Sequence, residues 1–127
     1  ISVKFPNSVI KQVYKNIVFL DGITYKVVRG FRQPYLTTPQ IKLQLQALAK
    51  TVPAAGIIFY ENNQIAPLVY VKPTNSYVWE NACGSGSLAF SLVTGTDLVK
   101  QPSGQYLTIQ KNNDTLTISS PVKEIYD

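Results

Sequence analysis

Short segments rich in β-branched and aromatic residues dominate the chain, and several of them alternate apolar with polar positions as half-buried strands do. The strands predicted from this pattern are Ile1–Phe5, Ile17–Leu20, Ile23–Val28, Gly56–Tyr60, Ile65–Val71, Ser76–Glu80, Gln105–Gln110, Thr115–Ser119 and Val122–Tyr126. Asp21-Gly22 separates two of these strands and favours a tight hairpin. The stretch from Gly30 to Tyr35 is predicted to be a loop.

Two segments have helical spacing instead. Gln40–Lys50 carries apolar residues on one face, and Thr38-Pro39 before it is a good N-cap followed by proline at the first helical position. Ser85–Thr94 contains only small or apolar residues and serines, and Gly95 is a suitable C-cap. A helix without a charged face is usually buried on all sides. The pattern therefore predicts an α+β fold with strands wrapped around one buried helix.

Composition narrows the class of protein. The 127 residues fit a single domain, 1–127, and 45% of them are hydrophobic. The net charge is +5, but the basic residues are scattered, which argues against nucleic-acid binding. No apolar run approaches the roughly 18 residues of a membrane span. One cysteine and no histidine leave no metal site of an ordinary type.

The most informative position is that single cysteine, Cys83, which stands directly before Gly84-Ser85-Gly86 and the second predicted helix. Unpaired backbone N–H groups and the helix dipole stabilise negative charge at a helix N-terminus, and they favour a thiolate there. The same N–H groups can bind a carboxylate or a phosphate. The segment thus combines a candidate base or nucleophile with an anion site. A lone functional thiol also suggests a reducing, cytoplasmic location.

Other interpretations of this segment remain open or can be excluded. A lone cysteine is often simply a core residue, and a tight strand-to-helix turn would also explain the glycines. The absence of histidine argues against a cysteine protease. A Cys-x5-Arg phosphatase would need arginine where Ala89 stands, and a phosphate-binding loop would need a lysine in the turn. What remains is a thiolate that accepts a proton beside a bound carboxylate.

The stretch Val78–Ala89, which contains Glu80-Asn81-Ala82-Cys83-Gly84-Ser85-Gly86, resembles the second catalytic cysteine motif of the diaminopimelate epimerase-like family of cofactor-independent amino-acid racemases and epimerases. Trp79-Glu80 before the motif looks closest to the histidine-racemase branch. Family members have two similar domains that each contribute one cysteine, with the substrate between them. The resemblance implies that this chain is the C-terminal half, that its partner is an N-terminal half with the second cysteine, and that no cofactor is needed.

The resemblance also implies roles for individual residues. Cys83 would act as acid and base, while the N–H groups of Gly84, Ser85 and Gly86 bind the substrate carboxylate and Glu80 and Asn81 contact the rest of the amino acid. The isolated chain is then expected to be inactive, and the face that meets the other half would allow a homodimer. The alternatives are a non-catalytic binding module of the same fold, or a carboxylate-based isomerase in which Cys83 is structural.

Overall fold

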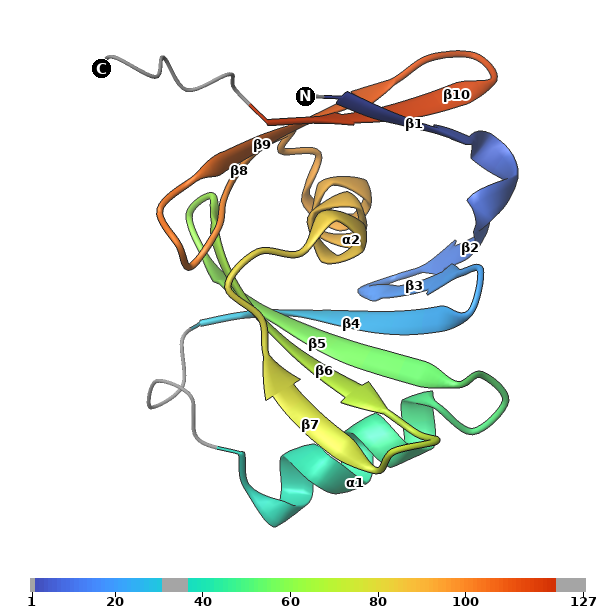
Figure 1. The fold of residues 1–127 in the computed structure, drawn as a ribbon, viewed down its shortest axis with the longest axis vertical. Helices are drawn as coiled ribbons and strands as arrows, with labels where there is room; N and C mark the ends of the chain where they lie inside the picture. The colour runs from blue at the N-terminus through green and yellow to red at the C-terminus, as the bar shows by residue number, and fades with distance from the viewer. Residues whose placement is uncertain (1, 31–36, 121–127) are drawn as a thin grey trace.

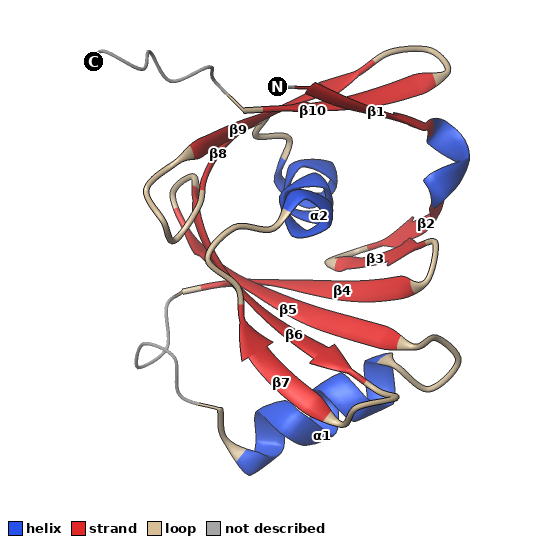
Figure 2. Ribbon diagram, viewed as in Figure 1, coloured by secondary structure: helices blue, strands red, loops and turns tan. Residues whose placement is uncertain are grey.

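A computed structural model of the protein describes residues 2–30 and 37–120. Strands dominate these ranges, and helices are few (Figure 2). The strands are β1 Ser2–Pro6, β2 Ile10–Tyr14, β3 Ile17–Leu20, β4 Ile23–Arg29, β5 Ala54–Glu61, β6 Gln64–Val71, β7 Ser76–Trp79, β8 Leu98–Lys100, β9 Tyr106–Lys111 and β10 Thr115–Ser119; the helices are α1 Pro39–Leu48, α2 Gly84–Thr94 and the short 3-10 helix η1 Asn7–Val9. The predicted α+β class is therefore confirmed.

The strands form one sheet in the order β1-β10-β9-β8-β6-β5-β4-β3-β2, and β7 also pairs with β6. Neighbours are mostly antiparallel, but β4 and β5 run parallel, with Ile23 opposite Ala54, and the short β6–β8 pairing is also parallel. A parallel pair needs a crossover connection, and α1 lies in the segment that joins β4 to β5. Strand β6 is a branch point, because β8 pairs near its start at Gln64 and β7 pairs with its second half, Leu68 to Val71.

Helix α2 lies inside the curve of this sheet, with β8, β9, β10 and β1 on one side and β3, β4 and β5 on the other (Figure 1). Its middle turns are buried, and it packs on β3, β4, β5, β6 and β9. Helix α1 covers the opposite face of β4, β5 and β6. Both faces of β5 are consequently buried: Ile58 joins the core around α2, whereas Ile57 and Phe59 join the core under α1.

The local predictions agree well with these elements. The hairpin at Asp21-Gly22 is present, with Gly22 at a φ of 81°, and both helices begin and end within two residues of the predicted positions. Strands β2 and β8 were missed; β2 is almost wholly exposed and β8 has three residues, so neither leaves a clear burial pattern. The predicted strand Val122–Tyr126 lies outside the described residues, as does nearly all of the predicted loop at 30–35.

Neither α1 nor α2, nor any other helix in the described part of the chain, is long and apolar enough to cross a membrane. The diaminopimelate epimerase-like label for the arrangement of strands and central helix stays a prediction.

Candidate active site

The thiol of Cys83 caps helix α2. Cys83 is the N-cap residue, in an extended conformation, and its Sγ accepts a hydrogen bond from the backbone N–H of Gly86 at 3.2 Å. At the other end the helix closes on Gly95 in the left-handed conformation, with a φ of 78°. The side chain of Cys83 is half-buried. The predicted position of the sulfur, at the positive end of the helix dipole, is therefore found in the structure.

The backbone of Cys83 is held from the core by Gln101 and Ser87. The Cys83 N–H donates to Gln101 Oε1 at 2.8 Å, and the Cys83 carbonyl accepts from Ser87 Oγ at 2.7 Å and from the Ser87 N–H at 3.0 Å. Gln101 Nε2 closes the ring by donating to Ser87 Oγ at 2.8 Å. Both side chains are fully buried. Neutral groups thus fix both peptide groups of the cysteine without placing a charge in the core.

A buried tyrosine reaches the thiol from strand β4. The hydroxyl of Tyr25 lies 2.6 Å from Ser85 Oγ and 3.4 Å from Cys83 Sγ, and the distance from Ser85 Oγ to the sulfur is 3.8 Å. Burial, followed by the negative charge of Cys83 and, to a smaller extent, that of Glu80, raises the pKa of Tyr25 well above its ordinary value. Tyr25 therefore keeps its proton and can donate it in a hydrogen bond.

Two glycines make room for this cluster. A Cβ on Gly86 would lie 2.7 Å from Ile58 Cδ1 and 2.9 Å from Cys83 Sγ, so only glycine lets the helix approach β5 with the sulfur at its cap. On β5, a Cβ on Gly56 would overlap the ring of Tyr25. The close approach of strand β5, helix α2 and the tyrosine ring thus depends on both positions.

The first turn of α2 leaves two backbone donors available. The N–H of Gly86 faces the sulfur and that of Ser87 faces the Cys83 carbonyl. Across residues 2–30 and 37–120, the N–H groups of Gly84 and Ser85 have no acceptor. Gly84 and Ser85 both line a cavity, and a Cβ on Gly84 would meet nothing closer than Ile118 Cδ1 at 3.7 Å. Of the three predicted carboxylate donors, two are therefore available to a ligand.

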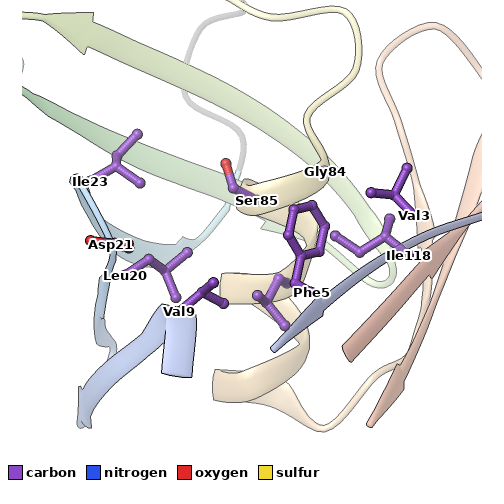
Figure 3. Close-up of a pocket in the computed structure, with 10 residues that line it drawn as sticks. Val3, Phe5, Val9, Leu20, Asp21, Ile23, Gly84, Ser85 and Ile118 are labelled. Carbon is purple, nitrogen blue, oxygen red and sulfur yellow. The ribbon is translucent and has the colours of Figure 1, made fainter. Parts of the chain in front are cut away.

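A cavity of about 390 Å³ opens beside these two residues (Figure 3). Strands β1 and β10 form one wall, the turn between β3 and β4 forms the opposite wall, and the first turn of α2 lies between them. The lining residues are Val3, Phe5, Val9, Leu20, Asp21, Ile23, Gly84, Ser85, Leu88 and Ile118. The lining is almost entirely apolar, and Asp21 is its charged residue. Such a cavity suits a small ligand with an apolar or flat side chain.

The two remaining predicted site residues lie in the loop before Cys83. Glu80 is half-buried, and its backbone N–H donates to the Pro67 carbonyl at 2.9 Å. Asn81 is exposed, and its carbonyl accepts from the Ser103 N–H at 3.1 Å. These bonds hold the loop between β6 and the turn that follows β8. The structure gives neither side chain a hydrogen bond to the thiol, although the charge of Glu80 acts on the nearby Tyr25 hydroxyl.

Sequence reasoning missed Tyr25 and Gln101. Tyr25 stands in an apolar strand segment and cannot be distinguished from an ordinary core aromatic residue, and Gln101 follows a short strand without any motif. Their contacts with Cys83 join residues 58 and 18 positions apart, so no local pattern identifies them. Within the described ranges, no group of three or more His, Cys, Asp or Glu side chains could hold a metal ion.

Two comparisons with known proteins find similarity to histidine racemases. A family model described as "Histidine racemase CntK N-terminal domain" matches residues 6–123. A histidine racemase of Fusobacterium nucleatum subsp. nucleatum is 36% identical over 80 residues, which cover 57% of this chain and 30% of that protein. The chain thus matches less than a third of the length of that curated relative.

The match also corrects one expectation. The matching family model is that of an N-terminal domain, whereas the cysteine motif led us to expect the C-terminal half. The resemblance itself implies two similar halves that each carry one cysteine. A local motif around one cysteine consequently does not tell the two halves apart.

Proposed function

Because the chain belongs to the histidine racemase CntK N-terminal domain family, we propose that it is one domain of a cofactor-independent amino-acid racemase in which Cys83 exchanges the α-proton of the substrate. The observation that carries this proposal is the position of the thiol. It caps a buried helix, accepts a hydrogen bond from Gly86, and adjoins two available N–H donors at an open cavity. A base and an anion site are thus next to each other.

In the proposed reaction, the Cys83 thiolate takes the α-proton from one face of the amino acid. The C–H bond breaks, an S–H bond forms, and the electron pair left on the α-carbon spreads into the carboxylate. A second thiol, on another part of the same protein, then donates its proton to the opposite face and becomes a thiolate. In the reverse direction Cys83 begins as the thiol, so each sulfur alternates between acid and base.

The negative charge that develops on the carboxylate needs stabilisation where it forms. The N–H groups of Gly84 and Ser85 have no acceptor within the described residues, and both residues line the cavity at the positive end of α2. They would donate to the carboxylate oxygens. Gly86 contributes differently, by donating to the sulfur. Its N–H therefore stabilises the thiolate, while the two preceding residues stabilise the carbanion.

The cavity beside these donors would hold the substrate side chain. Apolar residues such as Phe5 and Ile118 line this cavity, and the Asp21 carboxylate offers a partner for a ring N–H. Histidine is the favoured substrate because the relative described above is named a histidine racemase. Glu80 would orient the substrate ammonium, and Asn81 would contact it from the same loop.

Deuterium incorporation at the α-carbon tests the proposal. The full-length protein that contains this chain is incubated in D2O with histidine, glutamate, proline or diaminopimelate, and exchange is followed by proton NMR. We expect incorporation into histidine and its loss in Cys83→Ala. Thr38→Ala, at the cap of the other helix, serves as the control and should retain exchange. Undiminished exchange in Cys83→Ala would mean that the thiol is structural, and exchange with none of the four would favour a non-catalytic module.

A further inference from the structure

We propose that Tyr25 is a positioning residue that stabilises the thiolate form of Cys83 by donating its hydroxyl hydrogen to Sγ, with Ser85 as the partner that lets the same hydroxyl serve the thiol form. The inference rests on the proposed function, because a thiol that alternates between acid and base must be stable in both states. It adds a residue from β4 to a site that sequence motifs place entirely at the start of α2.

Geometry leaves the tyrosine hydroxyl few partners. Tyr25 is 1% exposed, and within the described residues its hydroxyl has two hydrogen-bond partners, Ser85 Oγ at 2.6 Å and Cys83 Sγ at 3.4 Å. A buried hydroxyl that lost one of these partners would be costly, since water cannot replace it. The glycine at position 56, which makes room for the ring, keeps the hydroxyl at this place.

The tyrosine hydroxyl needs both Cys83 and Ser85 as partners to stay hydrogen-bonded in the two protonation states of the sulfur. When Cys83 is a thiolate, Tyr25 donates to the sulfur and Ser85 donates to the tyrosine oxygen. When the sulfur gains a proton, its S–H donates to the tyrosine oxygen, and Tyr25 then donates to Ser85. Both states satisfy the buried hydroxyl without any movement of heavy atoms. The direct route through Tyr25 is favoured over one through Ser85 because the sulfur is closer to the tyrosine, at 3.4 Å against 3.8 Å.

The tyrosine is suited to remain a donor throughout. Burial and the charge of Cys83 raise its pKa, so the hydroxyl does not itself ionise when the sulfur does. Two further charged groups lie around this end of α2: Glu80, whose charge acts on the hydroxyl, and Asp21 in the cavity wall. Neither provides a donor to the sulfur. In the described residues, the donors to the thiolate are thus the Gly86 N–H and the Tyr25 hydroxyl, with Ser85 beside them.

The test compares Tyr25→Phe with the unmodified full-length protein. Alkylation of Cys83 by iodoacetamide is measured against pH, with the peptide that carries Cys83 quantified by mass spectrometry. Loss of one hydrogen bond to a charged group should move the alkylation midpoint upward by about one pH unit and slow alkylation below the midpoint about tenfold. A profile that superimposes on that of the unmodified protein would overturn the proposal.

Two further variants make the result specific. Tyr70→Phe removes a buried tyrosine hydroxyl from the core under α1 and should leave the profile unchanged; an equal shift there would point to general loosening and overturn the proposal. Ser85→Ala leaves the sulfur as the acceptor for Tyr25, which favours the thiolate, so the midpoint should not rise. An upward shift of one unit in Ser85→Ala would assign the direct donor to Ser85 instead. This variant keeps the test decisive if Tyr25→Phe fails to fold.

Alkylation does not depend on racemisation. If deuterium exchange fails in the unmodified protein while the Tyr25→Phe shift is observed, the proposed function is wrong and the role of Tyr25 stands. If exchange is present and the shift is absent, the inference about Tyr25 fails alone.

Discussion

Helices α1 and α2 begin with the same hydrogen bond made by different atoms. Thr38 Oγ1 accepts from the Ile41 N–H at 3.2 Å, and Cys83 Sγ accepts from the Gly86 N–H at 3.2 Å. A threonine hydroxyl is a favoured cap, whereas sulfur is a weak acceptor. The start of α1 therefore meets the ordinary needs of a helix, and the start of α2 gives up capping strength for a group that can ionise.

The two caps also differ in how deeply their helices are buried. Helix α1 has proline at its first position and lies on the outside of the sheet, largely exposed. Helix α2 is buried over its middle turns, and its cap residue is held by the fully buried Gln101 and Ser87. Long-range hydrogen bonds thus compensate for the weak sulfur cap. The stability of the α2 end therefore depends partly on groups other than the thiol, whereas the α1 end depends on its threonine cap.

The largest expected effect comes from Cys83→Ser in the full-length protein. The serine hydroxyl is a better cap but a far weaker base, so α-proton exchange should fall by about 10²- to 10⁴-fold while the unfolding midpoint stays the same or rises. Exchange is measured by NMR and unfolding by urea titration. Thr38→Ser, the matched replacement of one cap residue by another at α1, should change neither the rate of α-proton exchange nor the unfolding midpoint. Retained exchange in Cys83→Ser would remove the distinction between the two caps.

Gln101→Leu should cause the next largest effect. It leaves the Cys83 N–H without its partner and removes the hydrogen bond that Ser87 Oγ accepts, although Ser87 Oγ still donates to the Cys83 carbonyl. An unsatisfied buried group costs about 1–3 kcal/mol of unfolding free energy. Urea unfolding monitored by circular dichroism measures the loss. Gln46→Leu removes an exposed hydrogen bond, which Gln46 Nε2 donates to the Tyr77 hydroxyl at 2.8 Å. Its free energy of unfolding should stay within about 0.5 kcal/mol of that of the unmodified protein. Equal losses in the two variants would show that the hydrogen bonds from Gln101 do not support the cap at Cys83.

The two glycines of the first turn should separate packing from ligand binding. Gly86→Ala forces a methyl group against Ile58 and the sulfur, which should cost about 1–3 kcal/mol of stability. Gly84→Ala meets only an ordinary contact with Ile118, so the fold should be retained, but the methyl group enters the cavity and should slow exchange. Thermal unfolding and deuterium exchange are measured on both variants. Unaltered exchange in Gly84→Ala would place the carboxylate elsewhere.

Thr38→Ala should have the smallest effect. Removal of a hydroxyl cap costs about 1 kcal/mol, and this loss should appear in urea unfolding without any change in exchange or in the alkylation of Cys83. A change in alkylation would mean that the two helix ends are coupled through the sheet between them.

Much of the framework was predictable because it depends on neighbouring residues. The Asp21-Gly22 hairpin, the Thr38 cap and the position of Cys83 before α2 each follow from a few adjacent residues, and the structure contains all three. The parallel pairing of β4 with β5 and the branch at β6 were not predictable in this way. They depend on which apolar faces meet, and the alternation of one strand does not specify its neighbour.

The site likewise contains residues that local sequence places and residues that only tertiary packing places. Local sequence is enough to place a thiol at a helix N-terminus beside two glycines, because capping and turn formation act over three or four residues. The groups that surround the thiol were decided by packing: Tyr25 comes from 58 residues away and Gln101 from 18, and both meet Cys83 only because the sheet curves around α2. A short motif is enough to identify the reactive sulfur, whereas Tyr25 and Gln101 reach it only when distant segments pack together in the folded protein.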